Sequence, residues 1–298
     1  MFISDKIVFV ELQKTGCTHI RNALRDVVGG EFVERHIQAD PRLFVDGRKF
    51  LGSVRDPWNW YLSLWAYSCD GQGDFFDNVT TRGIRLRKRG WRLRPFELLT
   101  EVMHSRPNWH PREWQRTFRD INDAGAFREW LHMLADPTYW PDVGEGYWRC
   151  PLNRFAGLLT YRYMKLFTCR KGELDTLRAV TTPEQLVEFE RRNNFIDHFI
   201  RNEHLAPDLL AALKRVGVHV SAEVAAGITN RPRTNTSSRK RKATYYYDKA
   251  TEKLVADRER LIIDRFRYVA PGAQLDTRPP VLDSFERRRA SQAQAVGG

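Results

Sequence analysis

Residues 14–18, which read Lys-Thr-Gly-Cys-Thr, have the types and spacing of an anion-binding loop. The apolar residues 8–10 precede them, and residues 20–27 carry apolar side chains at helical spacing. This pattern predicts a buried strand, a turn and a helix. The loop would then lie at a helix N-terminus, where backbone N–H groups and the helix dipole attract an anion. Lys14 adds a positive charge to that site.

The order of residues in this loop disfavours an ordinary ATPase or GTPase. The common nucleotide loop reads Gly-x-x-x-x-Gly-Lys-[Ser/Thr], with the Lys after the second Gly. Here Lys14 precedes the single Gly16, and no Ser or Thr follows a Lys that comes after a Gly. A nucleotide-dependent kinase with an atypical phosphate loop is an alternative, and it would need a magnesium-binding carboxylate at a strand end.

A second strand-to-helix turn follows further along the chain. Residues 50–54 form an apolar run that ends in Arg55-Asp56-Pro57. Pro57 suits the first turn of a helix, on which Ser63 would lie about two turns further along. Arg55 offers a planar fork of donors to phosphate oxygens, and Ser63 adds a neutral donor. Because open α/β folds bind ligands at the carboxyl edge of the sheet, the two turns are expected to share one ligand.

Together the two turns resemble the cofactor site of the sulfotransferases that use 3′-phosphoadenosine 5′-phosphosulfate (PAPS). The Lys-Thr-Gly-Cys-Thr-His order resembles their 5′-phosphosulfate loop, and Arg-Asp-Pro with a later helical Ser resembles their 3′-phosphate site. The resemblance implies that Lys14 neutralises charge on the leaving phosphate oxygen and that no metal is required. It also implies that PAPS is bound by Lys14, Thr15, Gly16, Cys17, Thr18, Arg55 and Ser63.

Two later segments resemble other parts of the same family. Residues 195–205 with the helix 208–216 resemble a later strand and helix, and residues 244–268 resemble the end of the domain. The loop 235–241 would then close over the cofactor, with Arg239 or Arg241 near its 3′-phosphate. Cys17 is expected to act as a small loop residue through its backbone N–H.

The resemblance implies an α/β fold with a P-loop-like central parallel sheet flanked by helices. The implied activity is transfer of a sulfuryl group from PAPS to a hydroxyl of a carbohydrate or glycolipid, which can be acidic. We expect one domain over residues 1–270, a substrate-recognition insertion over 70–150 and a mobile tail over 271–298. Animal relatives in the Golgi carry an N-terminal membrane anchor, and its absence here leads us to expect a cytoplasmic, bacterial protein.

The general base that takes the proton of the acceptor hydroxyl is expected to be His36, because His titrates near neutral pH. Residues 32–37 are expected to form the second strand, and in heparan-type uronyl 2-O-sulfotransferases a His in a comparable place acts as the base. The alternatives are Glu11, at the start of the phosphate loop, and His104 or His110 in the middle of the chain.

The net charge of +12 raises nucleic-acid binding as a non-enzymatic alternative, since the basic residues cluster at 85–94, 231–242 and 287–289. PAPS and acidic glycans are also anionic, and no nucleic-acid motif is recognisable. The middle of the chain is rich in Trp, which suits either a core or a sugar-binding cleft. These residues are Trp91, Trp109, Trp114, Trp140 and Trp148. Helices are expected at 95–104 and 127–134, and loops at 71–83 and 137–146.

Overall fold

The computed structural model describes residues 1–45, 47–81, 110–231 and 238–273, and the chain divides into two compact units. Unit 1 comprises Met1–Trp60, Pro151–Thr236 and Glu252–Gly298, and unit 2 comprises Tyr61–Cys150 and Ser237–Thr251. The expected insertion at 70–150 falls within unit 2. Its role in substrate recognition stays a prediction.

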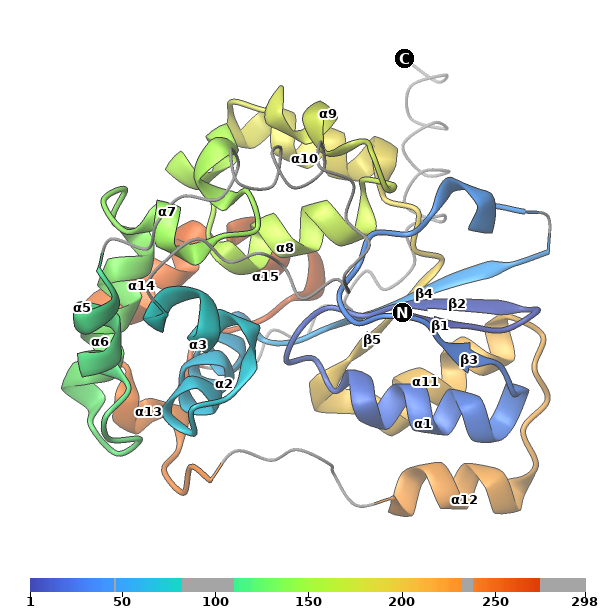
Figure 1. Cartoon of the computed structure of the whole chain (residues 1–298). Coiled ribbons are helices and arrows are strands. Elements are labelled where there is room, and N and C mark those ends of the chain that lie inside the picture. Colours follow the sequence, from blue (N-terminus) through green and yellow to red (C-terminus); the bar gives the residue numbers. More distant parts are fainter. Residues whose placement is uncertain (46, 82–109, 232–237, 274–298) are drawn as a thin grey trace. The chain divides into compact units, whose positions relative to one another are not determined.

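Unit 1 contains a mixed five-stranded sheet with the order β3-β1-β2-β4-β5 (Figure 1). Its strands are β1 (Phe2–Ile3), β2 (Ile7–Val10), β3 (Glu31–Phe32), β4 (Lys49–Val54) and β5 (His198–Arg201). The α/β class is therefore confirmed. The expected parallel sheet is confirmed only in part, because β2, β4 and β5 are parallel whereas β1 pairs antiparallel with both β2 and β3. Only three residues separate β1 from β2, which permits a hairpin but no crossover connection.

The strands that lead to the site are parallel. Val10 of β2 lies opposite Gly52 of β4, and Val54 of β4 lies opposite Arg201 of β5. All four residues of β2 are buried, as the apolar run predicts for a strand covered on both faces. The carboxyl ends of β2, β4 and β5 therefore meet at one edge of the sheet.

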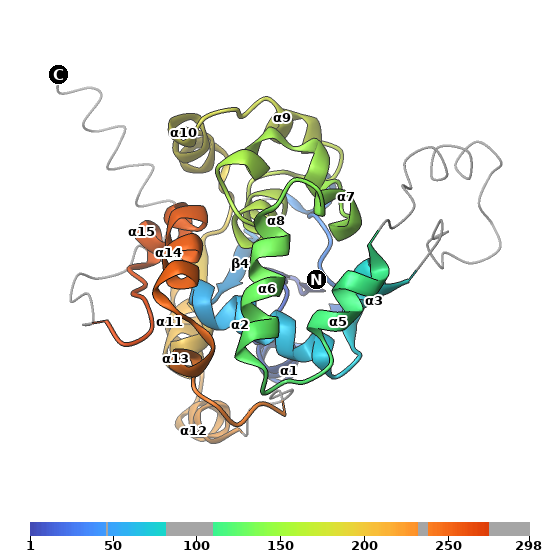
Figure 2. The ribbon, with the colours of Figure 1, turned by 90° about the vertical axis from the view of Figure 1, so that its left-hand side faces the viewer.

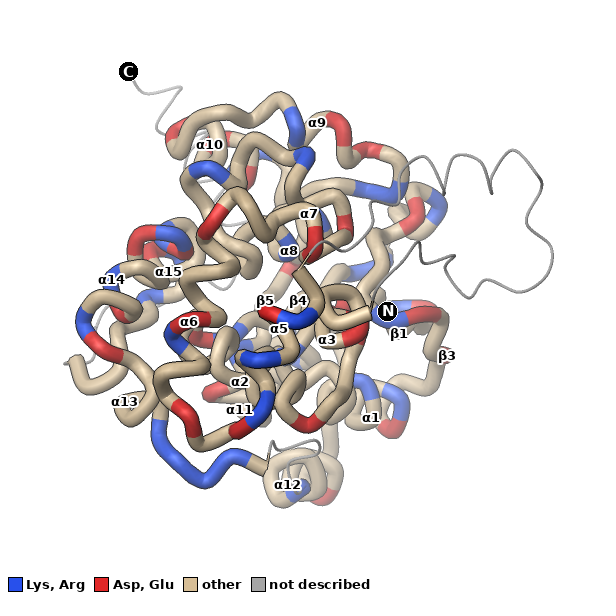
Figure 3. Tube along the Cα trace, turned by 60° about the vertical axis from the view of Figure 1, so that its left-hand side comes forward, with Lys and Arg blue, Asp and Glu red and all other residues tan. Residues whose placement is uncertain are grey.

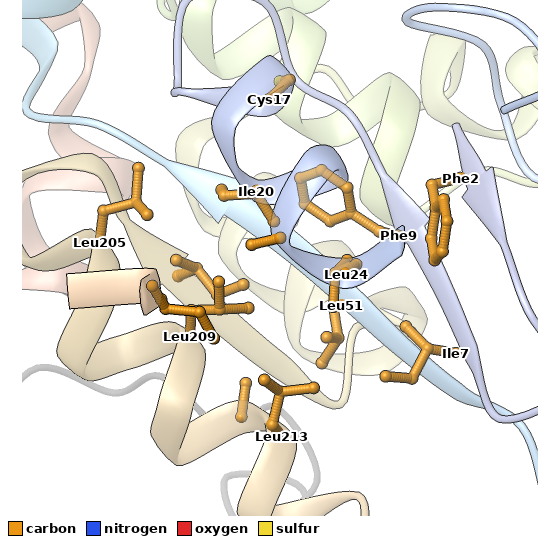
Figure 4. Close-up of a cluster of buried hydrophobic side chains, with 14 residues drawn as sticks. Phe2, Ile7, Phe9, Cys17, Ile20, Leu24, Leu51, Leu205, Leu209 and Leu213 are labelled. Carbon is orange, nitrogen blue, oxygen red and sulfur yellow. The ribbon is translucent and has the colours of Figure 1, made fainter. Parts of the chain in front are cut away.

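Two helices cover one face of this sheet, α1 (Cys17–Val28) and α11 (Leu205–Arg215) (Figure 1). Ile20 and Leu24 of α1 and Leu209 of α11 are fully buried in one cluster with Phe9 and Leu51 of the strands (Figure 4). Side chains three or four positions apart share a helix face, so the spacing of the apolar residues places them all on the face that packs against the sheet. Burial of each such side chain contributes about 1.5–3 kcal/mol.

Aromatic side chains of α8 (Leu158–Phe167) and α15 (Arg260–Phe266) pack against β5. The ring of Phe199 lies 5.7 Å from that of Tyr163, 5.2 Å from that of Phe167 and 5.2 Å from that of Phe266. The remaining α-helices of unit 1 are α9 (Leu174–Arg178), α10 (Pro183–Asn193) and α12 (Ala222–Asn230), whereas α14 (Lys249–Arg258) begins in unit 2. Short 3-10 turns occur at Pro41–Leu43, Tyr147–Arg149, Pro151–Arg154 and Asn202–His204.

Unit 2 is helical over its described residues, and α3, α5 and α6 pack against one another (Figure 2). Its helices are the later part of α2 (Pro57–Cys69), α3 (Gly73–Thr80), α5 (Pro111–Thr117), α6 (Ala124–Ala135), α7 (Trp140–Val143) and α13 (Ala243–Tyr246). Large aromatic residues fill its core, among them Trp65, Trp114, Phe127 and Trp130, each less than 2% exposed. The area that such rings bury makes them the main stabilising element of this unit.

The helix expected at 127–134 is confirmed within α6, and the strand and helix expected within 195–216 are confirmed as β5 and α11. The loop expected at 71–83 is wrong, because Phe75 and Val79 lie one helical turn apart and are both buried in α3. The loop expected at 137–146 contains the short helix α7. The helix expected at 95–104 and most of the expected tail lie outside the described residues.

Among the parts of the chain that the structure describes, no helix combines the length and apolar character needed to cross a bilayer.

Candidate functional site

The loop that follows β2 has an unusual backbone conformation. Lys14 has φ 64° and Gly16 has φ 86°, both in the left-handed region, which disfavours a side chain at most positions. A Cβ atom on Gly16 would lie 2.8 Å from Nδ2 of Asn202 and 2.9 Å from Cδ1 of Leu205. Glycine at position 16 therefore permits both the positive φ and the close approach of the segment after β5.

Gly16 is also the N-cap residue of α1, and as a glycine it has no side chain to cap the helix. The first turn of a helix presents backbone N–H groups that have no intrahelical partner. These groups and the helix dipole make the start of α1 suitable for an anion. The local structure thus agrees with the expected anion-binding loop.

Two side chains of the loop are directed inwards. The Thr15 hydroxyl donates a hydrogen bond to the Leu12 carbonyl at 2.6 Å and lies 2.6 Å from the Ser53 hydroxyl. The Cys17 thiol donates to the same carbonyl at 2.8 Å. Burial, followed by the negative charge of Glu11, raises the pKa of Cys17 to about 11, so its thiol stays protonated. Thr15 and Cys17 can therefore bind a ligand only through their backbone.

Lys14 and Thr18 differ from these residues, since both are partly exposed. A bound anion can therefore reach the side chains of Lys14 and Thr18. Lys14 supplies the charge and Thr18 a hydroxyl donor at the first turn of α1.

The turn after β4 reaches the loop directly. Nη1 of Arg55 donates a hydrogen bond to the Lys14 carbonyl at 3.1 Å, and Nε1 of Trp60 donates to the Gln13 carbonyl at 2.6 Å. The structure thus brings Lys14 and Arg55 together, as the sequence predicts. Ser63 lies on α2 as expected, but Ser63 and Arg239 belong to unit 2, so their participation in a shared phosphate site stays a prediction.

A pair of carboxylates occupies the turn beside Arg55. Asp56 caps α2 by accepting the Trp58 N–H at 3.0 Å, and its own N–H donates to Oε1 of Glu203 at 3.0 Å. The Tyr268 hydroxyl donates to Oε2 of Glu203 at 3.3 Å. Burial and the charge of Glu203 raise the pKa of Asp56 to about 6. No local signal in the sequence connects Tyr268 with this turn, because the contact joins segments far apart in the chain.

His36 does not lie in a strand, contrary to the prediction for residues 32–37. Strand β3 ends at Phe32, and His36 occupies a bend with φ 56°. Phe32 and Val33 are 45% and 50% exposed, so the apolar residues that suggested a strand do not face a core.

The environment of His36 nevertheless suits a base. Its Nδ1 lies 3.1 Å from the carbonyl oxygen of Glu11. A carbonyl can only accept, so Nδ1 carries the proton and Nε2 keeps its lone pair. Burial lowers the pKa of His36 from the ordinary value of 6.5, which favours the neutral ring.

The alternative bases differ in their partners. The Glu11 side chain is fully buried, and its Oε1 accepts from Nη1 of Arg21 at 3.1 Å, so it forms an internal ion pair. In unit 2, Nδ1 of His110 lies 2.9 Å from Oδ2 of Asp142, which also accepts the Trp114 indole N–H at 3.0 Å. A carboxylate that orients a His is also a general-base arrangement. His104 lies outside the described residues.

Of the tryptophans considered for sugar binding, Trp114 is fully buried and belongs to the core. Trp140 and Trp148 are partly exposed, and Trp91 and Trp109 lie outside the described residues. The basic clusters at 85–94 and 287–289 also lie outside them. Within the described ranges, no three His, Cys, Asp or Glu residues are grouped so that they could hold a metal ion.

Comparisons with known proteins give this chain no relative. No family model matches it, and neither a curated protein nor a solved structure matches it.

Proposed function

We propose that the protein is a PAPS-dependent sulfotransferase that transfers a sulfuryl group to a hydroxyl of a carbohydrate or glycolipid. The observation that carries this proposal is the hydrogen bond from Arg55 to the Lys14 carbonyl, which joins two strand-end turns, each with one cation, at one sheet edge. A ligand held there meets the N-terminus of α1, Lys14 and Arg55. A nucleotide with separate 5′- and 3′-anionic groups suits two such turns.

The residues of the first turn fit an anionic group of this kind. The N-cap of α1 is a glycine, which has no side chain to cap the helix, and the lack of a Cβ lets Asn202 and Leu205 approach the loop closely. The 5′-phosphosulfate would be held by the backbone of residues 14–18 and by Lys14. The 3′-phosphate would be held by Arg55.

The reaction requires removal of a proton and balance of charge. PAPS supplies the sulfuryl group and yields adenosine 3′,5′-bisphosphate. Nε2 of His36 accepts the acceptor hydroxyl proton while the acceptor oxygen bonds to sulfur and the bond from sulfur to the phosphate oxygen breaks. Lys14 compensates the negative charge that develops on this phosphate oxygen. Positioning and charge compensation then provide most of the rate enhancement, as in phosphoryl transfer.

The proposal is tested by incubating the protein with ³⁵S-labelled PAPS and a panel of neutral and acidic oligosaccharides and glycolipids, in buffer with EDTA. Transfer of the label to a member of the panel, with equimolar release of adenosine 3′,5′-bisphosphate, would support it. A parallel incubation contains γ-labelled ATP and magnesium. Phosphate transfer in that incubation, with none from PAPS, would instead identify a kinase.

A further inference from the structure

Unit 2 contains a segment in which three exposed cations shortly precede an exposed aromatic residue in the sequence. Residues 239–242 read Arg-Lys-Arg-Lys, and Lys240, Arg241 and Lys242 are exposed. Tyr245 follows within the next helix and is 45% exposed. Figure 3 shows this stretch as a continuous run of positive residues before α13. We call Lys240, Arg241, Lys242 and Tyr245 the basic–aromatic surface.

This surface is held in place by contacts within unit 2. The Ser238 hydroxyl donates to Oδ1 of Asp70 at 2.8 Å, directly before the basic run. The Tyr245 hydroxyl donates to the Asn122 carbonyl at 3.0 Å. The Tyr245 ring meets the buried Tyr246 ring edge-on, with centroids 5.1 Å apart. The exposed ring is therefore fixed before any ligand binds, which lowers the entropic cost of binding.

Charge and ring lie close enough to act on one ligand. The guanidinium carbon of Arg241 lies 5.4 Å from the centroid of the Tyr245 ring. Carboxylates of neighbouring segments have partners of their own, since Asp70 accepts from Ser238 and Oδ1 of Asp123 accepts the Ala126 N–H at 3.0 Å. An acidic sugar polymer matches both features, because sulfates and carboxylates pair with the cations while the apolar face of a sugar packs on the ring.

We propose that the basic–aromatic surface binds an acidic polysaccharide, the polymer whose hydroxyl the protein sulfates. Its role as the acceptor rests on the proposed function, whereas binding itself does not. Single-stranded nucleic acids are bound by several rings that stack successive bases. In residues 238–251 the neighbours Tyr246 and Tyr247 are buried, and Tyr245 alone offers a large exposed ring. One ring flanked by cations suits a sugar chain better.

The test is fluorescence anisotropy of the full chain, without PAPS, with three labelled probes of similar length. The probes are a heparin oligosaccharide, a neutral dextran oligosaccharide and oligo(dT). We expect the heparin probe to bind most tightly and the dextran probe not to bind. The double variant Lys240→Ala/Lys242→Ala should bind heparin about fivefold more weakly, because it loses two exposed ion pairs. The control variant Arg25→Ala/Lys214→Ala removes two exposed cations of unit 1 and should retain the wild-type affinity.

The ring is tested separately. Tyr245→Leu should weaken heparin binding about threefold to tenfold, whereas Tyr245→Phe keeps the ring and should retain most of the affinity. An equal loss in both double variants would overturn the proposal, because net charge alone would explain it. Tighter binding of oligo(dT) than of heparin would also overturn it and would assign the surface to nucleic acid. If the protein transfers sulfate but binds heparin independently of Lys240 and Lys242, the proposed role of this surface is refuted and the proposed sulfotransferase function is not.

Discussion

The loop after β2 and the turn after β4 both lead from a buried parallel strand into a helix, but they differ in what occupies the helix N-terminus. After β4, the Asp56 carboxylate caps α2, and Glu203 accepts the Asp56 N–H. After β2, the N-cap of α1 is Gly16, which has no side chain to cap the helix, and the polar side chains of Thr15 and Cys17 bond to the Leu12 carbonyl.

This difference indicates which turn is available to an anion. The N-terminus of α2 is already capped by the Asp56 carboxylate, so an anion at this turn depends on the Arg55 side chain rather than on the helix N–H groups. The N-terminus of α1 has Lys14 beside it and begins at Gly16, which has no side chain to cap the helix. Arg55 connects the two turns, because it leaves the acidic turn and donates to the Lys14 carbonyl. The second turn therefore supplies a cation to the first.

The largest expected effect concerns His36, whose Nδ1 lies against the carbonyl of Glu11, just before the loop. His36→Ala should lower kcat about 10²- to 10⁴-fold, because the acceptor hydroxyl loses its base. Binding of adenosine 3′,5′-bisphosphate, measured by calorimetry, should not change. The exposed His204 provides the control variant His204→Ala. Undiminished turnover in His36→Ala would show that another residue is the base, and His110 would be tested next.

The pH profile tests the same residue. Only neutral His36 can accept a proton, and burial lowers its pKa below 6.5. The acid limb of the rate profile, along which the rate declines as the pH falls, should therefore be centred below pH 6.5. An acid limb centred above pH 6.5 would contradict the assignment of His36 as the base.

Lys14 is expected to have the next largest effect. Lys14→Asn should lower kcat about 10²- to 10³-fold, because one preorganised charge at the leaving oxygen is lost. Asn tolerates the left-handed conformation of this position, so the backbone of the loop should persist. Lys6→Asn removes an exposed charge at the other end of β2 and should leave kcat unchanged. Similar losses in both variants would show that the loop has no special role.

The backbone of the loop can be tested by adding a single methyl group. Gly16→Ala should destabilise the protein by about 1–3 kcal/mol, because φ is 86° and the new Cβ would meet Asn202 and Leu205. Gly227→Ala, within α12, meets no atom within 4 Å and should be neutral or stabilise by about 0.5–1 kcal/mol. Urea denaturation measures both. A stable Gly16→Ala variant that binds bisphosphate normally would contradict the proposed backbone approach.

The smallest expected effect lies in the acidic turn. The pKa of Asp56 is raised from 3.8 to about 6, so its charge begins to disfavour the folded state as the pH rises through this interval. Asp56→Asn keeps an oxygen for the Trp58 N–H and removes the charge. We expect it to raise the free energy of unfolding by about 1 kcal/mol or less near pH 7. The gain should be smaller near pH 4.5. A gain that is equal at both pH values, or that also occurs in the exposed control Asp5→Asn, would argue against the carboxylate pair.

The sequence predicted the local elements of the site correctly. The strand, loop and helix around Lys14 and the strand, turn and helix around Arg55 depend on apolar periodicity and on Pro57, which are local signals. The α/β class followed from them.

The sequence could not predict features that depend on distant contacts. Strands β1 and β3 have two residues each and show no periodicity, so their antiparallel pairing was missed. The strand predicted around His36 failed because its apolar residues face solvent. The contacts of Asn202 with Gly16 and of Tyr268 with Glu203 join segments that are far apart in the chain. They became apparent only in the folded structure.

The proposed cofactor site is tested by calorimetric titration of the wild-type protein and Arg55→Ala with adenosine 3′,5′-bisphosphate in EDTA. We expect the bisphosphate to bind the wild type without a metal ion. Binding to Arg55→Ala should be about 10- to 100-fold weaker, because a charge-assisted hydrogen bond is lost. The control variant Arg25→Ala should bind as the wild type does. Absence of binding to the wild type, equal affinity in Arg55→Ala, or tighter binding of ATP with magnesium would contradict the proposed cofactor site.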